Sequence, residues 1–449
     1  MPGGLLTDLY ELNMAASYMR RGMWGPATFS LFVRHLPPER GFLVAAGLDD
    51  VLSWLEEFGF DEQDLDYLIG LGFDREAIDA FAGLHFGGDV WAVPEGRIVC
   101  ANEPIVEVTA SIPVAQLVET YLLNQISFQT TLATKAARCR IAAAGRIDLV
   151  DFGFRRTQGI EAGMAVARLS SMVGFAATSN VEAAHRFGLS PAGTMAHSYI
   201  QAFPSEQEAF AAFARDMPER TTFLVDTYDT RTGVLHAVEV IRDLGLEDRS
   251  GIRLDSGDLE SLAFEARTIL DDAGLPRVRI FVSGGLDEHD IARLVAVGAP
   301  VDAAGIGTRM GVSADAPYLD SAYKLVDYQG RPVAKLSTAK ATLPGAKQVF
   351  RAGGLRDVIG LRSESGPPAT VPLLEPVMHE GRRVSGSGGW AAARRRFEAD
   401  LEQLPGESAE LLRPVPLRAG ITAALRDLDS EVSQSLLRAL AGPAGAPPP

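Results

Sequence analysis

The chain has 449 residues, of which 47% are hydrophobic and 22% charged, a composition typical of a soluble globular protein with two or three domains. Its formal net charge of −16 argues against nucleic acid or an anionic membrane as the main partner, because both require a basic face. Cys100 and Cys139 fit neither a metal motif nor a disulfide framework, so a reducing cytoplasm is expected. The N-terminal residues lack the basic region of a secretory signal, and no apolar run reaches the roughly 18 residues of a membrane span.

An N-terminal α+β domain is predicted for residues 1–113. Its first element is a helix at 5–20, in which Asp8 and Glu11 have the spacing of a capping box. Tyr10 lies in the first turn, and periodicity alone favours a core position for its ring. The other expected elements are a strand at 27–33, a helix at 44–58, two short helices up to residue 83, and a strand-rich segment at 88–112.

Residues 114–335 predict an α/β domain on parallel strands. A long helix is expected up to about residue 144, and short apolar strands then alternate with helices, one of which should be capped by Ser205 with Glu208 three residues later. This alternation, with a repeat of roughly 25–30 residues, is typical of an irregular α/β barrel of the TIM type. The strands are expected at residues 147–152, 222–226, 251–255, 278–283 and 301–305.

The last part of the chain has a less regular pattern. Residues 336–440 are expected to return in part to the N-terminal domain, with helices at 390–402 and 420–437. Residues 333–351 contain four Lys or Arg, which favours a solvated hairpin. Residues 441–449 are rich in Pro, Gly and Ala and are expected to be disordered.

Carboxylates and glycines follow four of the expected strands. In a parallel barrel the carboxyl ends of the strands lie at one rim, where active sites are built. Paired glycines let backbone N–H groups approach a phosphate. These turns together indicate a substrate that carries phosphate. They are Asp226, Asp255-Ser256-Gly257-Asp258, Ser283-Gly284-Gly285 and Gly305-Ile306-Gly307-Thr308.

Two further features lie within residues 151–202. Arg155 and Arg156 directly follow Phe-Gly-Phe, and paired guanidinium groups suit phosphate or carboxylate because each can donate two parallel hydrogen bonds. His197 lies in Gly-Thr-Met-Ala-His-Ser, where small residues and hydroxyls suit proton or phosphoryl chemistry. Taken singly, an Arg pair is more often a solvated surface and a lone His a structural residue.

Six short pieces in this order resemble the nicotinate phosphoribosyltransferases, which have the type II phosphoribosyltransferase fold. The resemblance extends from Thr7 to about Arg351. It implies an irregular α/β barrel with an N-terminal domain, and a homodimer whose active site lies at the subunit interface. It also implies a reaction that joins nicotinate to phosphoribosyl pyrophosphate, giving nicotinate mononucleotide and pyrophosphate while ATP is hydrolysed. The six pieces are Thr7-Asp8-Leu9-Tyr10, Asp151-Phe152-Gly153-Phe154-Arg155-Arg156, Gly193-Thr194-Met195-Ala196-His197-Ser198, Arg253-Leu254-Asp255-Ser256-Gly257-Asp258-Leu259, Ser283-Gly284-Gly285-Leu286-Asp287-Glu288 and Gly305-Ile306-Gly307-Thr308.

The resemblance also implies roles for individual residues. His197 is similar to the histidine that ATP phosphorylates, and Tyr10 to the aromatic residue that stacks on the pyridine ring. Thr194 and Arg253 resemble nicotinate contacts, and Arg155 resembles the arginine that holds pyrophosphate. Asp255 and Asp258 would hold ribose hydroxyls or Mg²⁺, and which does which stays open. The further substrate contacts expected by position are Phe152, Arg156, Ser179, Gly284, Gly285, Gly305, Gly307 and Thr308.

Three alternative functions are considered. Nicotinamide phosphoribosyltransferases carry an Asp in the segment matching Thr178-Ser179-Asn180, whereas Ser179 stands here, which favours the acid substrate because an Asp would repel a carboxylate. A barrel aldolase or isomerase would need a Schiff-base Lys or an acid/base pair at a strand end, and none of the strand ends carries a Lys. A non-catalytic nucleotide sensor is disfavoured by the presence of His197 together with both arginines.

Overall fold

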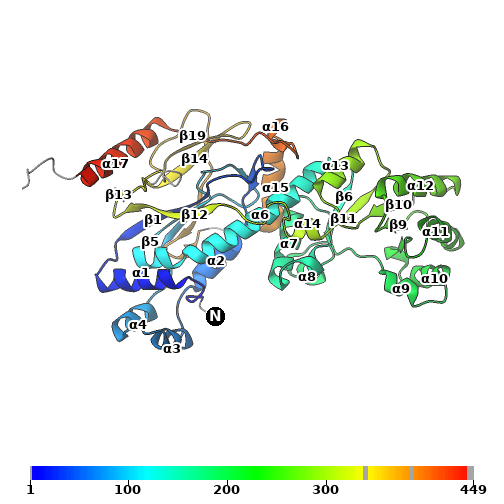
Figure 1. The fold of residues 1–449 in the computed structure, drawn as a ribbon, viewed down its shortest axis with the longest axis horizontal. Helices are drawn as coiled ribbons and strands as arrows, with labels where there is room; N and C mark the ends of the chain where they lie inside the picture. Colours follow the sequence, from blue (N-terminus) through cyan, green and yellow to red (C-terminus); the bar gives the residue numbers. More distant parts are fainter. Residues whose placement is uncertain (1–2, 337–341, 385–387, 442–449) are drawn as a thin grey trace, which may run out of the picture. The chain divides into compact units, whose positions relative to one another are not determined.

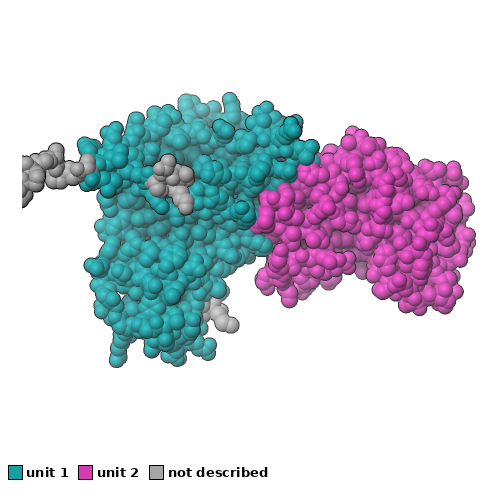
Figure 2. Space-filling view, in the orientation of Figure 1, with its two compact units in different colours: residues 1–131, 318–449 teal, residues 132–317 magenta. Residues whose placement is uncertain are grey.

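The computed structural model describes residues 3–336, 342–384 and 388–441, and the chain forms two compact units (Figure 2). Unit 1 comprises Met1–Thr131 and Tyr318–Pro449, and unit 2 comprises Leu132–Pro317. The first of these boundaries falls beyond the expected limit of 113 because one long helix, α6 (Glu119–Ala143), contributes to both units. The second falls before the expected limit of 335 because β12 (Ser321–Tyr328) pairs with β1 in unit 1. The expected disordered tail lies outside the described residues, apart from residue 441, which ends α17.

Unit 1 is built around a seven-stranded sheet in its described residues, with the order β13-β12-β1-β5-β3-β17-β18 (Figure 1). The central strand β1 is buried along almost its whole length and pairs antiparallel with both β12 and β5. Strand β17 pairs with β3, so the C-terminal segment adds strands to the sheet of the N-terminal residues. The strands are β1 (Pro26–Val33), β3 (Asp89–Ala92), β5 (Val106–Ser111), β12 (Ser321–Tyr328), β13 (Arg331–Pro332), β17 (Glu375–His379) and β18 (Arg382–Arg383).

Smaller sheets and helices complete unit 1. A four-stranded sheet has the order β16-β14-β15-β19, and β2 (Leu43–Val44) pairs with β4 (Ile98–Val99). The strands of the four-stranded sheet are β14 (Lys347–Ala352), β15 (Arg356–Leu361), β16 (Val371–Pro372) and β19 (Gly420–Ile421). The helices are α1 (Leu9–Arg20), α2 (Leu48–Glu57), α3 (Glu62–Gly70), α4 (Arg75–Ala82), α5 (Ile112–Leu117), α15 (Gly389–Leu401), α16 (Gly406–Ala409), α17 (Ala423–Ala441) and the first part of α6.

The capping box expected at the start of α1 is wrong. Asp8 occupies the N-cap position, but its side chain accepts no hydrogen bond from the helix. Glu11 is fully buried and instead accepts hydrogen bonds from the hydroxyls of Thr7 and Thr120 and from Tyr10. The Glu11 carboxylate therefore contacts α6 and does not cap the amino end of α1.

The solvated hairpin expected at residues 333–351 is also wrong for the basic residues in β14. Lys347 and Arg351 are buried, because carboxylates on neighbouring strands neutralise them. Lys347 Nζ lies 3.3 Å from Glu107 Oε1, and Arg351 Nη2 lies 2.6 Å from Asp357 Oδ2. A charge count along the sequence cannot reveal such partners, which are far from these residues in the chain or face them across a hairpin. Part of the segment, residues 337–341, lies outside the described residues.

Unit 2 is built on six parallel strands in the order β7-β6-β11-β10-β9-β8, counted over its described residues. Five strands were expected, and the sixth, β7 (Ala177–Thr178), is only two residues long and lacks a recognisable apolar run. The others are β6 (Asp148–Asp151), β8 (Thr222–Leu224), β9 (Gly251–Leu254), β10 (Arg279–Val282) and β11 (Ala303–Ile306). Helices connect them: α7 (Ile160–Met172), α8 (Val181–Phe187), α9 (His197–Gln201), α10 (Glu206–Asp216), α11 (Thr230–Leu244), α12 (Leu259–Asp272), α13 (Glu288–Ala296) and α14 (Thr308–Gly311).

The six strands curve around a common interior, as in an irregular α/β barrel. A cavity of about 920 Å³ is lined by residues from all six of them. Strands β7 and β8 are the two edges of the sheet, so hydrogen bonds do not close the barrel between them. The α/β barrel predicted from the sequence is confirmed in this open form. No helix among the described residues combines the length and apolarity needed to cross a bilayer.

Candidate active site

The carboxyl ends of the unit 2 strands bring together most of the residues that the sequence singles out. All neighbouring strands pair in parallel, so the turns that follow them lie at one edge of the sheet, called here the rim. The turns carry Phe152 after β6, Ser179 after β7, Asp226 after β8, Asp255 after β9, Ser283 after β10 and Gly307 after β11.

Arg253 on β9 has the most extensive side-chain contacts at the rim and is only 8% exposed. Its Nε donates to Ser283 Oγ at 2.7 Å, and its Nη1 donates to Thr194 Oγ1 at 2.9 Å. Its Nη2 donates to Asp255 Oδ1 at 2.7 Å. The guanidinium carbon lies 5.4 Å from the centre of the Phe152 ring, within cation–π range. A guanidinium held on several sides is a rigid donor for a planar anion.

His197 begins the short helix α9, and its imidazole is oriented by a hydroxyl. Nδ1 lies 3.1 Å from Thr227 Oγ1, within hydrogen-bond distance, and Nε2 lies 3.9 Å from Asp255 Oδ2. The side chain is 41% exposed, so a ligand at the rim can reach the ring. The imidazole thus has fixed neighbours and an accessible face, as a phosphoryl acceptor requires.

Asp255 connects Arg253 with His197. Burial acts to raise the pKa of its carboxyl group, but hydrogen bonds from Ser283 and Arg253, together with the charge of Arg253, hold that pKa below its usual value. Asp226 in turn supports Asp255: its Oδ2 accepts from the Asp255 backbone N–H at 2.9 Å. The Asp226 Oδ1 atom is buried and has no hydrogen-bond partner in the described part of the chain.

Asp258 differs from Asp255 in being exposed. Ser261 Oγ donates to its Oδ2 at 2.7 Å, and this hydrogen bond lowers the pKa of the carboxyl group. Asp258 stands immediately before α12 but makes no side-chain cap to that helix. Its carboxylate is therefore ionised and open to a ligand or a cation.

The Arg pair projects from a single turn of 3₁₀ helix, Phe154–Arg156, that follows β6. Arg155 and Arg156 are both exposed, and neither pairs with another side chain in the described residues. The turn is held by a backbone hydrogen bond from Arg156 N–H to Gly153 O at 2.7 Å. Two guanidinium groups on one rigid turn can meet an anion together.

Asp151 fixes the start of this turn from inside the sheet. Its Oδ1 accepts from Gly153 N–H at 2.7 Å, and its Oδ2 accepts from Thr178 Oγ1 at 2.7 Å. Burial raises the pKa of Asp151 to about 6. The carboxyl group thus joins the turn after β6, which carries the arginines, to β7, which precedes Ser179.

The glycine pair after β10 is required by backbone geometry. Gly284 has φ +110°, and a Cβ there would lie 2.0 Å from the backbone oxygen of Asp255. Gly285 has φ +73°, in the left-handed region, but a Cβ would meet nothing within 4 Å. Both are exposed, so the backbone around them is open to a ligand.

The glycines within and after β11 serve the site in different ways. Gly305 is buried under the Phe152 ring, where a Cβ would come within 2.6 Å of the ring. Gly307 precedes α14, and Thr308 is the exposed first residue of that helix. Gly305 therefore makes room for Phe152, whereas Gly307 and Thr308 present backbone and hydroxyl groups at the rim.

Ser179 and Thr194 line the unit 2 cavity together with Phe152. Ser179 N–H donates to Asp151 O at 2.8 Å, which sets its position beside β6. Three of the residues expected to contact a substrate therefore line one cavity.

Tyr10 lies in unit 1, and the core position expected from periodicity is wrong. Its side chain is 48% exposed, and its hydroxyl donates to Glu11 Oε1 at 3.1 Å. Burial, followed by the charge of Glu119, raises the pKa of the Tyr10 hydroxyl far above its usual value. An exposed, neutral tyrosine ring is suited to stacking on a planar ligand.

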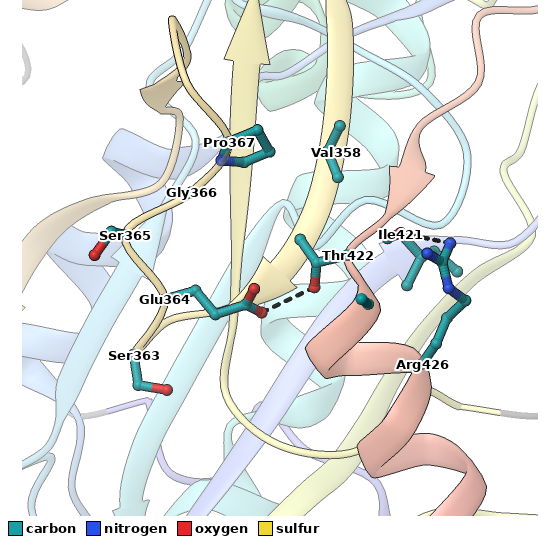
Figure 3. A pocket seen from close by; sticks show the side chains of 10 residues that line it. Val358, Ser363, Glu364, Ser365, Gly366, Pro367, Ile421, Thr422 and Arg426 are labelled. Atoms are coloured by element: carbon teal, nitrogen blue, oxygen red, sulfur yellow. Dashed lines mark hydrogen bonds between the residues drawn. The ribbon is translucent and has the colours of Figure 1, made fainter.

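A second hollow of about 680 Å³ lies in unit 1, between β15 and the start of α17 (Figure 3). Glu364 accepts a hydrogen bond from Thr422 Oγ1 at 2.9 Å, and Arg426 Nη1 donates to Ile421 O at 2.8 Å. Its charged groups are thus engaged by the protein, and it contains none of the residues singled out by the sequence.

Residues 5–127 match the nicotinate phosphoribosyltransferase N-terminal domain, and residues 147–349 match the nicotinate phosphoribosyltransferase family. The chain is 50% identical over 410 residues to a nicotinate phosphoribosyltransferase of Mycobacterium tuberculosis, covering 88% of this chain and 87% of that protein. Identity to the Bacillus subtilis nicotinate phosphoribosyltransferase is 43%, covering 77% and 72%. The crystal structure of human nicotinic acid phosphoribosyltransferase superposes with a TM-score of 0.84 at 28% identity, covering 95% of this chain and 99% of that one.

The chain belongs to the nicotinate phosphoribosyltransferase family. It is therefore an enzyme of NAD biosynthesis, and the resemblance on which the sequence-based prediction rests is confirmed.

The structure of this nicotinate phosphoribosyltransferase family member also shows supporting contacts at the rim that the sequence does not reveal, one of them from Thr227, a residue that the sequence-based prediction did not single out. Ser283 holds Arg253, Thr227 holds His197, and Asp226 and Asp151 hold the turns that carry Asp255 and the arginines. Ser283, Asp226 and Asp151 stand in the motifs and strand ends identified from the sequence, but the residues that they hold could not be read from it. No sequence signal marks Thr227 apart from its place beside Asp226.

Proposed function

We propose that this enzyme joins nicotinate to phosphoribosyl pyrophosphate at the unit 2 rim, releasing nicotinate mononucleotide and pyrophosphate, with ATP hydrolysed through phosphorylation of His197. We place it in the cytoplasm as a homodimer. Family membership supports the two substrates, and the two free, buried cysteines, Cys100 and Cys139, suit a reducing compartment. The dimer and the ATP step follow from the resemblance of the six sequence pieces.

The observation that carries this proposal is the setting of Arg253. Its guanidinium is nearly buried, contacts the Phe152 ring and bonds Thr194, and both Phe152 and Thr194 line the cavity. A planar pyridine carboxylate matches this combination, because the ring can lie against Phe152 while the carboxylate meets the cation and the hydroxyl. Ser179 lines the same cavity and adds no negative charge that would repel the carboxylate.

The chemistry at the rim is largely charge neutralisation. When pyrophosphate leaves the ribose, negative charge accumulates on its oxygens and positive charge on the ring carbon. Arg155 and Arg156 are placed on a rigid turn from which they can meet the leaving group. The open backbone at Gly284, Gly285 and Gly307 can accept the phosphate of the ribose.

The rim residues fit a requirement for Mg²⁺. Mg²⁺ is usually held by one or two carboxylates together with substrate phosphates, so a dedicated cluster of protein ligands is not needed. Asp258 offers an exposed, ionised carboxylate, and Asp255 is the second candidate. Bound Mg²⁺ would supply further neutralisation of the leaving pyrophosphate.

A single assay tests the reaction and distinguishes it from the nicotinamide alternative. The purified chain is incubated with phosphoribosyl pyrophosphate, Mg²⁺ and either nicotinate or nicotinamide, with and without ATP, and mononucleotide is measured by chromatography. We expect nicotinate mononucleotide, with a higher rate when ATP is present. A preference for nicotinamide, or no mononucleotide from either pyridine, would contradict the proposal.

The ATP step is tested by the chemistry of the label. A phosphohistidine is acid-labile and base-stable, so γ-labelled ATP should give the protein a label with that behaviour. His197→Ala should abolish both the label and the stimulation by ATP, while slow synthesis without ATP remains because Arg155 and Arg253 are unchanged. His379→Ala is the control, since His379 lies on β17 in unit 1 and pairs with Asp89 there. A label that survives His197→Ala would place the phosphate elsewhere.

A further inference from the structure

A buried lysine, Lys135, lies in unit 2 on an otherwise small-residue stretch of α6. Its side chain is 2% exposed, and its neighbours Ala133, Ala136 and Ala137 are buried as well. A buried ammonium group is costly unless carboxylates neutralise it. Lys135 Nζ lies 2.5 Å from Glu288 Oε2 and 2.6 Å from Asp315 Oδ1.

Glu288 is held by a second cation on the same helix. Arg138 Nε donates to Glu288 Oε1 at 2.8 Å, so the two oxygens of this fully buried carboxylate meet two different side chains. Burial acts to raise the pKa of Glu288, but Lys135 and Arg138 hold it below the usual value. The cluster is thus a neutral set of two cations and two carboxylates.

Each of the two carboxylates lies in the segment that follows a rim loop: Glu288 after the β10 loop and Asp315 after the β11 loop. Glu288 is the first residue of α13 and lies three positions after Gly285. Asp315 lies beyond α14, in a segment tied to Gly307 and Thr308 by successive backbone hydrogen bonds, including Gly311 N–H to Gly307 O at 2.9 Å. Lys135 on α6 therefore joins the start of α13, which follows the loop after β10, to the segment beyond α14, which follows the loop after β11.

A second tie joins the same two loops on the exposed side. Arg309 Nη1 donates to Asp287 Oδ2 at 2.7 Å and to Asp290 Oδ2 at 3.3 Å. Asp287 is also the N-cap of α13 and accepts from the backbone N–H groups of His289 and Asp290. The loops are thus fixed to one another both in the interior and at the surface.

We propose that Lys135 is a positioning residue that sets the spacing between the two glycine loops, and thereby the affinity for phosphoribosyl pyrophosphate. This inference rests on the proposed function of those loops. Apolar residues of similar size often give equal or greater stability than a buried ion cluster, so stability alone does not require a lysine here. A lysine shared by two carboxylates does define the distance between the segments that carry them.

Lys135→Met should leave the two carboxylates without their shared cation and loosen both loops. We expect KM for phosphoribosyl pyrophosphate to rise about tenfold or more, because small displacements of substrate-positioning groups have large effects. KM for nicotinate should change much less. In the protein without ligands, backbone amide exchange should become faster at residues 283–288 and 305–309.

The matched control is Arg351→Met in unit 1. Arg351 is also a buried cation shared by two carboxylates, Asp357 and Asp400, but it touches neither rim loop. Both variants should lose thermal stability, because both leave buried carboxylates unpaired. Only Lys135→Met should raise KM for phosphoribosyl pyrophosphate.

A milder variant covers the case in which Lys135→Met does not fold. Asp315→Asn removes one charge at a side chain that is 26% exposed and keeps a group that can bond Lys135. It should raise the same KM by about two- to fivefold. An unchanged KM in the folded variants, with stability loss like that of Arg351→Met, would overturn the positioning role. Failure of the wild-type chain to form mononucleotide would instead overturn the proposed function.

Discussion

Under the proposed function, Arg253 distinguishes an anionic pyridine from a neutral one, and the protein already fixes its guanidinium for this role. Ser283, Thr194 and Asp255 hold its nitrogens, so little order has to be imposed when a ligand binds. A charge-assisted hydrogen bond contributes about 1.5–3 kcal/mol. Arg253→Leu should therefore raise KM for nicotinate by roughly ten- to a hundredfold, and KM for nicotinamide far less, in steady-state kinetics.

The control for this prediction is Ser283→Ala, which removes one support of the guanidinium but keeps its charge. It should affect the two pyridines to a similar and smaller extent. If Arg253→Leu weakened both pyridines equally, Arg253 would act on the architecture of the rim and not on the carboxylate.

The raised pKa of Asp151 predicts how the stability of the chain depends on pH. Its pKa is raised by burial to about 6 in the folded chain, from an ordinary value of 3.8. Between these values the folded state binds more protons than the unfolded state, so this group lowers stability as pH rises through the window. Asp151→Asn keeps an acceptor for Gly153 N–H and does not ionise, but its amide NH₂ replaces the oxygen that accepts from Thr178 Oγ1, so that hydroxyl must turn to accept. Relative to wild type, the variant should gain on the order of 3 kcal/mol between pH 4 and pH 7 in denaturant unfolding.

A difference between Asp151→Asn and wild type that stayed constant across this pH range would contradict the raised pKa. Asp258→Asn is a useful comparison, because Asp258 is exposed and its pKa is lowered. Its effect should not increase between pH 4 and pH 7 in the way expected for Asp151.

Single residues differ in how far the sequence reveals them. Arg253 and Asp255 are found because they stand in a recognisable motif at a strand end. Ser283 and Thr194, which hold Arg253, lie 30 and 59 positions away from it, and only the parallel sheet brings them together. Sequence reasoning placed these residues at the rim but could not assign their hydrogen-bond partners.

The loop after β10 offers a test at the level of elements. Gly284 and Gly285 are adjacent and exposed, and both have positive φ, yet a Cβ at Gly284 would collide with the Asp255 backbone whereas one at Gly285 meets nothing within 4 Å. Gly284→Ala should thus displace β10 from β9 and sharply lower the melting temperature. Gly285→Ala should cost only the strain of a left-handed alanine, about 1–2 kcal/mol.

Activity and thermal unfolding of the two alanine variants, measured side by side, decide this prediction. Equal destabilisation would mean that the contact between Gly284 and Asp255 does not limit the loop. Gly274→Ala gives the cost of a left-handed alanine away from the rim, since Gly274 has φ +73° and open space around it.

Elements with strong local signals were predictable. Ser205 caps α10 by accepting from Glu208 N–H, as expected from its spacing. Strand β7 was missed because two residues carry no periodicity, although its hydrogen bonds to β6 place Ser179 at the rim. The capping box at Asp8 failed because Glu11 found partners on α6, far away in sequence.

At the scale of the molecule, the order of segments along the chain does not follow the compact units. Strand β1 lies between β5, which begins about 70 residues after it, and β12, which begins almost 300 residues after it. The sequence pattern shows where the alternation of helices and strands changes, near residues 113 and 335. It does not show that α6 contributes to two cores, which puts one boundary at 131, or that β12 pairs with β1, which puts the other at 317.

The proposed homodimer, with active sites formed at the subunit interface, makes a prediction about mixtures. Tyr10 and His197 belong to different units of the chain. If Tyr10 of one subunit serves the rim of its partner, a heterodimer of Tyr10→Ala and His197→Ala chains contains one site with both native residues. Random pairing then restores about one quarter of wild-type sites.

The Tyr10→Ala and His197→Ala chains would be unfolded together and refolded. The mixture would then be assayed with ATP at nicotinate concentrations well below KM, because each variant measured separately should be least active there. His197→Ala mixed with Arg253→Leu is the control, because both changes lie in unit 2 and no heterodimer site can escape both of them. Activity no higher than the mean of the separate variants would mean that Tyr10 serves the rim of its own chain or none.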